Sequence, residues 1–100
     1  MPADPAASVK VQHDETGHRF FISLPSGHEA LLLYRRQGNT LDFYHTYVPE
    51  EFRGKGLAEK VVEAGFRYAQ DQRLKVIPTC SFVSRAFLRR RTEFLSLTAL

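Results

Sequence analysis

The chain has 100 residues, a single cysteine and a formal net charge of +3, and these values exclude several classes of protein. Its length fits one domain with one core. One cysteine allows no internal disulfide and suits a reducing compartment. No apolar run approaches the roughly 20 residues that span a bilayer, and residues 1–8 lack the pattern of a secretory signal. We therefore expect a cytoplasmic protein with no membrane partner.

The first half of the chain is rich in short apolar runs separated by turn residues, which predicts an antiparallel meander of strands. Residues 1–7 predict a disordered tail, and residues 8–100 a single domain. The four predicted strands cover residues 9–12, 18–24, 29–36 and 40–48. The third should be buried on both faces. On the fourth, strict alternation would place His45 on the same face as Phe43 and Tyr47.

At Leu57 the periodicity changes to that of an amphipathic helix, which should run to about Asp71 or Gln72. Residues 74–77 then predict a short buried strand, and residues 82–90 a second, shorter helix. The apolar tail 94–100 shows no clear pattern. A strand, a helix and a strand in this order form a βαβ unit, whose crossover should place the fourth and fifth strands side by side and parallel. The sequence thus predicts an α/β (α+β) fold, with antiparallel N-terminal strands, a βαβ unit and a short C-terminal helix.

The stretch from Val48 to Ala58, VPEEFRGKGLA, connects the fourth strand to the long helix. Two glycines flank a lysine just where the helix begins. Glycines let backbone N–H groups turn toward one point, and a helix N-terminus adds unpaired N–H groups and partial positive charge. These features predict an anion site, most naturally for phosphate. The loop matches neither a Walker A motif nor a dinucleotide fingerprint, since no Gly-Lys-Ser/Thr occurs and position 59 is Glu.

Within this stretch, Arg53-Gly54-Lys55-Gly56-Leu57-Ala58 resembles the Arg/Gln-x-x-Gly-x-Gly/Ala signature of the GNAT superfamily of N-acetyltransferases. The resemblance implies a GNAT-like fold, in which the fourth and fifth strands splay apart and the thioester arm of acetyl-CoA lies between them. It also implies that the loop holds the pyrophosphate of coenzyme A by backbone amides. The candidate residues for binding acetyl-CoA or coenzyme A are Tyr47, Val48, Arg53, Gly54, Lys55, Gly56, Leu57 and Ala58.

A second pattern points to the same superfamily. His45 precedes Val48-Pro49, and Cys80 follows Pro78 two residues later. This arrangement resembles a subgroup of small, single-domain GNAT proteins. The matching histidine and cysteine are that subgroup's candidate active-site pair, so the resemblance makes His45 and Cys80 the candidate catalytic residues.

Two chemical routes and one structural role are open to this pair. A thiol beside an imidazole can ionise and accept acetyl before passing it on. Alternatively, His45 acts as a general base while an amine attacks the thioester directly. In the structural interpretation, Cys80 is a small buried apolar residue and His45 a core histidine. The residues alone do not choose among these possibilities.

Basic residues cluster near the C-terminus, where Arg89, Arg90 and Arg91 follow Arg85. The simplest interpretation is a solvated helix face. The alternative is attraction of an anionic cofactor, with Arg85 or Arg89 reaching its phosphates. No RNA- or DNA-reading motif accompanies the charge, so we expect no nucleic-acid partner. The histidines show no metal-ligand spacing, so we also expect no metal.

We therefore predict an acetyl-CoA-binding N-acetyltransferase that acts on an unidentified amine, which could be a protein lysine, an N-terminus or a small amine. The alternative is a module that binds coenzyme A or acetyl-CoA without significant catalysis. Two departures from the larger GNAT enzymes favour that alternative. The chain is strand-like where those enzymes carry N-terminal acceptor helices, and no tyrosine follows Tyr68. The oligomeric state is left open.

Overall fold

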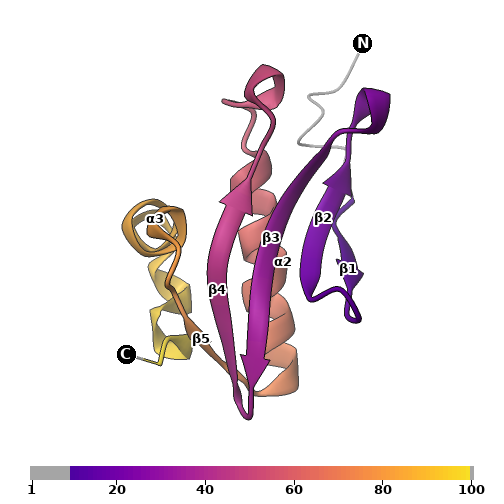
Figure 1. Ribbon diagram of the computed structural model, residues 1–100. Coiled ribbons are helices and arrows are strands. Elements are labelled where there is room, and N and C mark those ends of the chain that lie inside the picture. The colour runs from indigo at the N-terminus through magenta and orange to yellow at the C-terminus, as the bar shows by residue number, and fades with distance from the viewer. Residues whose placement is uncertain (1–9, 100) are drawn as a thin grey trace.

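The computed structural model describes residues 10–99, which form a two-layer α/β protein with a five-stranded sheet in one layer (Figure 1). The strands follow one another across the sheet, antiparallel from β1 to β4 and parallel between β4 and β5. They are β1 (Gln12–Asp14), β2 (Arg19–Ser23), β3 (Glu29–Gln37), β4 (Thr40–Tyr47) and β5 (Lys75–Ile77). The predicted fold class and the parallel βαβ unit are confirmed. The predicted tail, residues 1–7, lies outside the described residues.

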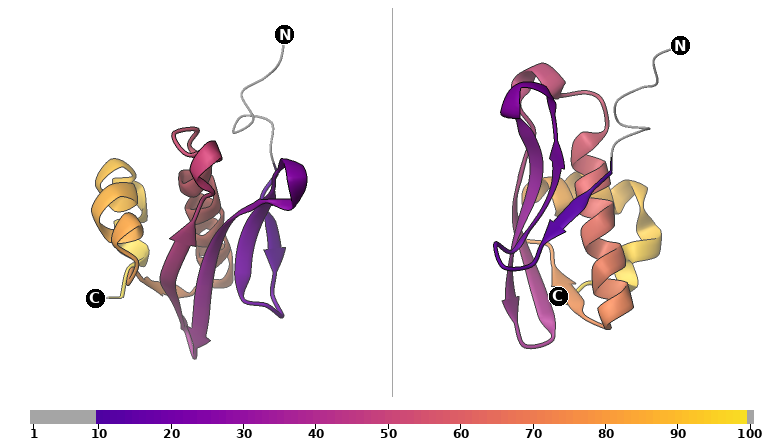
Figure 2. Two further views of the ribbon diagram at one scale, coloured as in Figure 1. Left: turned by 45° about the horizontal axis from the view of Figure 1, so that its top comes forward. Right: turned by 90° about the vertical axis from the view of Figure 1, so that its right-hand side faces the viewer.

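The helical layer consists of one long helix and several short helical segments. These are α2 (Leu57–Gln72), a π-helical segment (Phe82–Phe87) that continues into α3 (Leu88–Arg90), and 3₁₀ segments at Pro25–Gly27, Glu50–Phe52 and Thr92–Leu97. The two views of Figure 2 show α2 lying along one face of the sheet. The C-terminal helical segments lie past β4, beside the sheet (Figure 1).

The core forms where the apolar stripe of α2 packs on the sheet. The buried residues of α2 are Leu57, Val61, Val62, Gly65, Phe66 and Ala69, at the helical spacing that the sequence predicted. The closest approach is at Gly65, where an added Cβ would lie 2.8 Å from both Leu32 Cδ2 and Phe43 Cζ. Glycine in mid-helix costs helix propensity. Its presence here is explained by the short distance between helix and sheet.

α2 ends at Gln72, as predicted, because Arg73 adopts the left-handed conformation (φ 59°). The N–H of Arg73 bonds back to the carbonyls of Ala69 and Gln70, and the N–H of Leu74 bonds to Ala69 (2.8 Å). Such bonds satisfy the last carbonyls of a helix and reverse the chain. The reversal delivers β5 to the edge of β4.

The C-terminal tail, which the sequence left unassigned, forms the 3₁₀ segment Thr92–Leu97 and then a single bridge to the sheet. Phe94 is buried, and its ring lies 5.2 Å from that of Phe66 in α2. Thr98 then forms a parallel bridge with Val76, and the N–H of Ala99 donates to the Val76 carbonyl (2.8 Å). The tail therefore covers the outer edge of β5.

Two strand predictions need correction. β1 spans Gln12–Asp14 and not residues 9–12, because the Asp14 carboxylate accepts a hydrogen bond from the Gly17 N–H (2.9 Å) and so starts the turn later. Position 9 itself lies outside the described residues. The prediction that β3 is buried on both faces was wrong, because α2 covers only one face. From Glu29 to Tyr34, alternate residues are therefore buried and those between them are partly exposed, whereas the last three residues of β3 are exposed.

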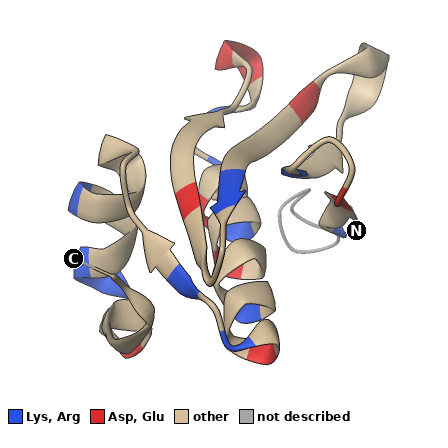
Figure 3. Ribbon diagram, turned by 60° about the horizontal axis from the view of Figure 1, so that its bottom comes forward, with Lys and Arg blue, Asp and Glu red and all other residues tan. Residues whose placement is uncertain are grey.

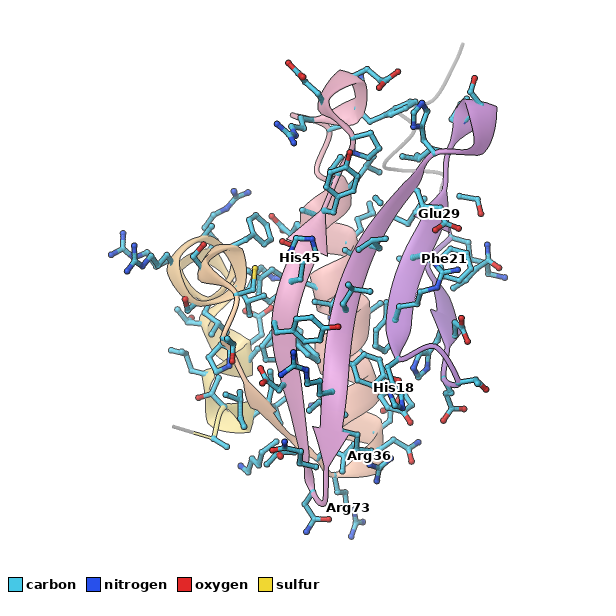
Figure 4. All side chains as sticks on the ribbon, in the orientation of Figure 1. His18, Phe21, Glu29, Arg36, His45 and Arg73 are labelled. Carbon is cyan, nitrogen blue, oxygen red and sulfur yellow. The ribbon has the colours of Figure 1, made fainter. Side chains whose placement is uncertain are left out.

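A bulge in β4 decides where its side chains point. Leu33 pairs with His45, but the next residue of β3, Tyr34, pairs with Phe43, so Tyr44 is the extra residue. The alternation of faces reverses at this point. Phe43 is buried against α2, whereas His45 is exposed on the sheet face turned away from α2 (Figure 4). The prediction that His45 shares a face with Phe43 was therefore wrong.

Candidate functional site

The candidate site lies where the parallel pairing of β4 and β5 ends, halfway along β4. β5 pairs with β4 only over Thr40–Asp42. Among the described residues, the last backbone hydrogen bond on this side runs from the Cys80 N–H to the Phe43 carbonyl (2.8 Å). The two strands thus separate beyond Phe43, and the chain after β5 turns into the helical segment that starts at Phe82. In open α/β sheets, ligands bind at such strand ends.

A cavity of about 570 Å³ occupies this end of the sheet. Its lining residues are Thr46, Tyr47 and Val48 from the end of β4, Phe52, Arg53, Gly54 and Gly56 from the loop, Leu57, Ala58 and Glu59 from the first turn of α2, and Phe82 and Arg90 from the C-terminal helices. Small-molecule sites commonly have volumes of about 300–1,000 Å³. The cavity therefore has the size of a ligand site, and both the start of the βαβ connection and the helices that follow β5 contribute to it.

Two glycines give the loop its shape. Gly54 (φ 81°) and Gly56 (φ 77°) both lie in the left-handed region, where other residues are strained. Gly56 is also the N-cap of α2 and has no capping side chain, so the first amides of the helix are left for water or a ligand. Arg53 Nε donates to the Val48 carbonyl (3.0 Å) and ties the loop to the end of β4. The loop thus combines free amides with the positive end of a helix, which suits an anion.

Cys80 lies just behind the wall of this cavity and is half-buried. Its Sγ is 3.4 Å from Oγ1 of Thr46, which lines the cavity. Burial by itself would raise the pKa of Cys80. The hydrogen bond with Thr46 and the backbone N–H groups of Phe82 and Val83 outweigh this effect, so the pKa of the thiol lies below its ordinary value. Such surroundings favour the thiolate, which is the nucleophilic form of cysteine.

The structure brings most of the predicted ligand-binding residues to one cavity. Those that line it are Tyr47, Val48, Arg53, Gly54, Gly56, Leu57 and Ala58, whereas Lys55 does not. Neither His45 nor Cys80 is among the lining residues. In the described part of the chain, no hydrogen bond joins His45 to Cys80, and the bulge turns His45 to the other face of the sheet. The structure therefore does not assemble them as a bonded pair.

Five lining residues were missed by reasoning from the sequence: Thr46, Phe52, Glu59, Phe82 and Arg90. Phe52 and Glu59 flank the glycine motif, so their neighbourhood was a usable signal. Arg90 belongs to the arginine run, where Arg85 and Arg89 were the residues expected to reach a ligand. Thr46 and Phe82 enter the cavity only through the bulge and through the packing of the C-terminal helices, which leave no local pattern.

An ion-pair network lies beside the cavity at Glu59. Arg91 contacts Glu59 Oε2 (3.4 Å), Glu63 Oε2 (3.2 Å) and Glu93 Oε2 (2.9 Å). Its guanidinium holds the pKa of Glu63 below the ordinary value through a hydrogen bond. Arg90 contacts the other carboxylate oxygen of Glu59 (3.1 Å). The acidic residues at positions 59 and 63 therefore share a guanidinium, and Arg91 does not belong to a freely solvated face.

Two features are absent from residues 10–99. None of its helices combines the length and the apolar character that crossing a bilayer requires. No group of three or more His, Cys, Asp and Glu side chains in this range is arranged to hold a metal ion.

The sheet, its βαβ unit and the glycine loop before the crossover helix have the arrangement of a GCN5-like acetyltransferase fold. Residues 19–97 match the family described as GCN5-related N-acetyltransferase. The chain belongs to this family.

Individual relatives agree with this assignment. The chain is 36% identical to Protein NATD1 of Xenopus tropicalis, over 82% of this chain and 77% of that one. It is 32% identical to Protein NATD1 of Homo sapiens, over 77% of this chain and 70% of that one. The NMR solution structure of a GCN5-like protein from Staphylococcus aureus superposes with a TM-score of 0.69 at 25% identity, covering 90% of this chain and 87% of that one. The predicted membership of the GNAT superfamily is thereby confirmed.

Proposed function

We propose that the protein is an acetyl-CoA-dependent N-acetyltransferase whose acyl donor binds in the cavity at the start of α2. The observation that carries this proposal is that the left-handed glycine loop, the open end of α2 and the half of β4 beyond its pairing with β5 line one space. Acetyl-CoA would supply a thioester carbonyl. An amine nitrogen attacks its carbon, so that a C–N bond forms, the C–S bond breaks and the proton lost by the amine passes to a base or to the departing thiolate.

The loop fits a pyrophosphate in its shape and in its charge. A Cβ added at Gly54 or Gly56 would meet no protein atom within 4 Å, so the space beside these residues is open to a ligand. The amides at the start of α2 would donate to phosphate oxygens, and Arg53 would add positive charge. Tyr47 and Val48, at the end of β4, would contact the arm that carries the thioester.

Cys80 and His45 are candidates for two different roles. The surroundings of Cys80 favour a thiolate, which would attack the thioester carbon and hold the acetyl group until an amine takes it. His45 lies two residues before Tyr47, past the bulge, and therefore shares its side of β4. It would accept the proton of an amine that approaches over the open face. If the amine attacks acetyl-CoA directly, only the role of His45 as a base is needed.

Calorimetric titration with coenzyme A tests the cavity. We expect binding by the unmodified protein and a loss of at least about tenfold in Gly56→Ala, because a Cβ there strains the loop and narrows its approach to phosphate. Gly27→Ala is the matched control, since Gly27 has a similar φ of 79° but lies in the β2–β3 connection. No binding of coenzyme A at millimolar concentration would refute the proposal.

The transfer itself is tested with acetyl-CoA, a panel of amines and intact-mass measurement. An acetyl adduct that disappears in Cys80→Ala, together with loss of turnover, would support the route through the thiol. Full turnover by Cys80→Ala would support direct transfer, for which His45→Ala should lower the rate of acetylation. Binding of coenzyme A without acetylation of any amine would contradict the enzymatic part of the proposal.

A further inference from the structure

Arg90 and Glu59 form an ion pair at the cavity, and their side chains differ strongly in exposure to solvent. Arg90 Nη2 lies 3.1 Å from Glu59 Oε1, and both residues line the cavity. The side chain of Arg90 is 73% exposed, whereas that of Glu59 is 29% exposed. An exposed pair of this kind contributes little to stability. Arg90 can therefore leave Glu59 at little cost.

Glu59 does not depend on Arg90 alone for neutralisation. Its second oxygen, Oε2, lies 3.4 Å from Arg91 Nη1, and the Arg91 side chain is only 22% exposed. The guanidinium of Arg91 also lies over the rings of Phe87 (5.6 Å) and Phe94 (5.4 Å), which fix its position. Glu59 thus keeps one fixed cation when Arg90 moves away.

The position of Glu59 makes this arrangement significant. It is in the first turn of α2, beside the glycine loop and within the cavity that suits an anion. An uncompensated carboxylate there would compete with an incoming anion for the positive end of the helix. The charged residues of the neighbouring C-terminal helical segment are all arginines, drawn blue in Figure 3, and Arg90 and Arg91 at its end are the two cations. The cavity can therefore accept an anion more readily while at least one arginine stays paired with Glu59.

We propose that Arg90 exchanges partners: it pairs with Glu59 in the free protein and moves to a phosphate group when a phosphorylated ligand enters the cavity. Arg91 is then a positioning residue that keeps Glu59 neutral in both states. This inference rests on the proposed function, in which coenzyme A is the phosphorylated ligand. It makes Arg90 a side chain that favours phosphorylated over unphosphorylated ligands, since a phosphate oxygen can take the place of the Glu59 carboxylate as its partner.

The first test compares Arg90→Gln with Arg89→Gln by calorimetric titration with coenzyme A at low salt. Both substitutions remove one positive charge from the same exposed helical segment, but Arg89 does not line the cavity. We expect a loss of about tenfold for Arg90→Gln and of less than about twofold for Arg89→Gln. Titration with 3′-dephospho-coenzyme A then locates the contact. A loss with both ligands assigns Arg90 to the pyrophosphate, and a loss with coenzyme A alone assigns it to the 3′-phosphate.

Equal losses for the two substitutions would overturn the inference, because general attraction by net charge would then explain both. In that case the unmodified protein still binds coenzyme A and the proposed function stands. If the unmodified protein does not bind coenzyme A, both proposals fall. The unfolding midpoint of each variant, measured alongside, shows whether it remains folded at the titration temperature.

The second test addresses the exchange itself with Glu59→Gln. Removing the resting partner should tighten coenzyme A binding by about threefold in the unmodified background, because Arg90 no longer has to leave a carboxylate. The same substitution should have little effect when combined with Arg90→Gln. Tightening of equal size in both backgrounds would mean that Glu59 acts by simple repulsion, and it would overturn the exchange.

Discussion

The two halves of β4 have the same length and follow each other directly in the sequence, yet they differ in their strand partners and in the burial of their side chains. In the first half, Thr40–Phe43, the strand lies between β3 and β5 and buries Leu41 and Phe43 completely. In the second half, Tyr44–Tyr47, it keeps β3 but has no β5 beside it, and none of its side chains is fully buried. The first half is anchored in the core, and the second is left available to a ligand.

Two local features draw this boundary. β5 is only three residues long and is followed closely by Pro78, which cannot donate a ladder hydrogen bond. The bulge at Tyr44 reverses the alternation, so that Thr46 and not His45 reaches the thiol of Cys80. A short partner strand and one extra residue are therefore enough to divide one strand into a structural half and a half that lines the cavity.

The comparison is tested most strongly by truncating one aromatic residue in each half. Phe43→Ala should lower the free energy of unfolding by about 3–5 kcal/mol, because it removes a fully buried ring that packs against Phe66. Tyr47→Ala should lower it by less than about 1 kcal/mol, since Tyr47 is 46% exposed, but should weaken coenzyme A binding. Urea unfolding and calorimetric titration measure the two quantities. Equal stability losses would erase the distinction between the halves.

The contact between the first half and α2 is tested by Gly65→Ala. The added methyl group would lie 2.8 Å from Phe43 Cζ and Leu32 Cδ2, so we expect a loss of about 1–3 kcal/mol in the free energy of unfolding. This loss should appear even though alanine favours the helix by about 1 kcal/mol. A gain in stability would show that α2 is free to move away from β4.

The turn that brings β5 to the first half is tested by Arg73→Gly. Arg73 has a φ of 59°, which glycine adopts without strain, so the free energy of unfolding should rise by about 0.5–1 kcal/mol. Gln72→Gly is the matched control. Gln72 is still helical, so this substitution should lower the free energy of unfolding by about 0.5–1 kcal/mol. If both substitutions destabilise, the left-handed turn does not limit stability.

The smallest expected change in stability comes from Thr46→Val in the second half, where the effect should be chemical. Losing the hydroxyl removes a hydrogen bond that lowers the pKa of Cys80, so the pKa of the thiol should rise. The rate of iodoacetamide alkylation as a function of pH measures it. Thr40→Val, in the first half, should leave this profile unchanged. An unchanged profile in Thr46→Val would mean that the backbone amides alone control the thiol.

Much of the fold was predictable because its signals are local. The glycines before Leu57 and the apolar stripe of α2 fixed the crossover helix, and the right-handed crossover rule fixed the parallel pairing of β4 and β5. The lining of the cavity was predictable where it is continuous in sequence. These parts depend on turn residues and on periodicity, which short continuous stretches of sequence reveal.

The remaining features depend on distant partners. Nothing in the alternating sequence of β4 marks Tyr44 as an extra residue, because its register is set by pairing with β3. The acidic residues at positions 59 and 63 should repel in an isolated helix, and only the packing of the C-terminal helices brings Arg91 between them. The same packing brings Arg90 to the cavity. Such contacts between distant segments leave no periodic trace in the sequence.

The parallel bridge between Val76 and Thr98 has a practical consequence for anyone who fuses another protein to this one. Without Thr98 and Ala99, the outer side of β5 would be an open strand edge that can pair with another molecule and start aggregation. A C-terminal tag therefore needs a flexible spacer, so that it does not pull these two residues off the sheet.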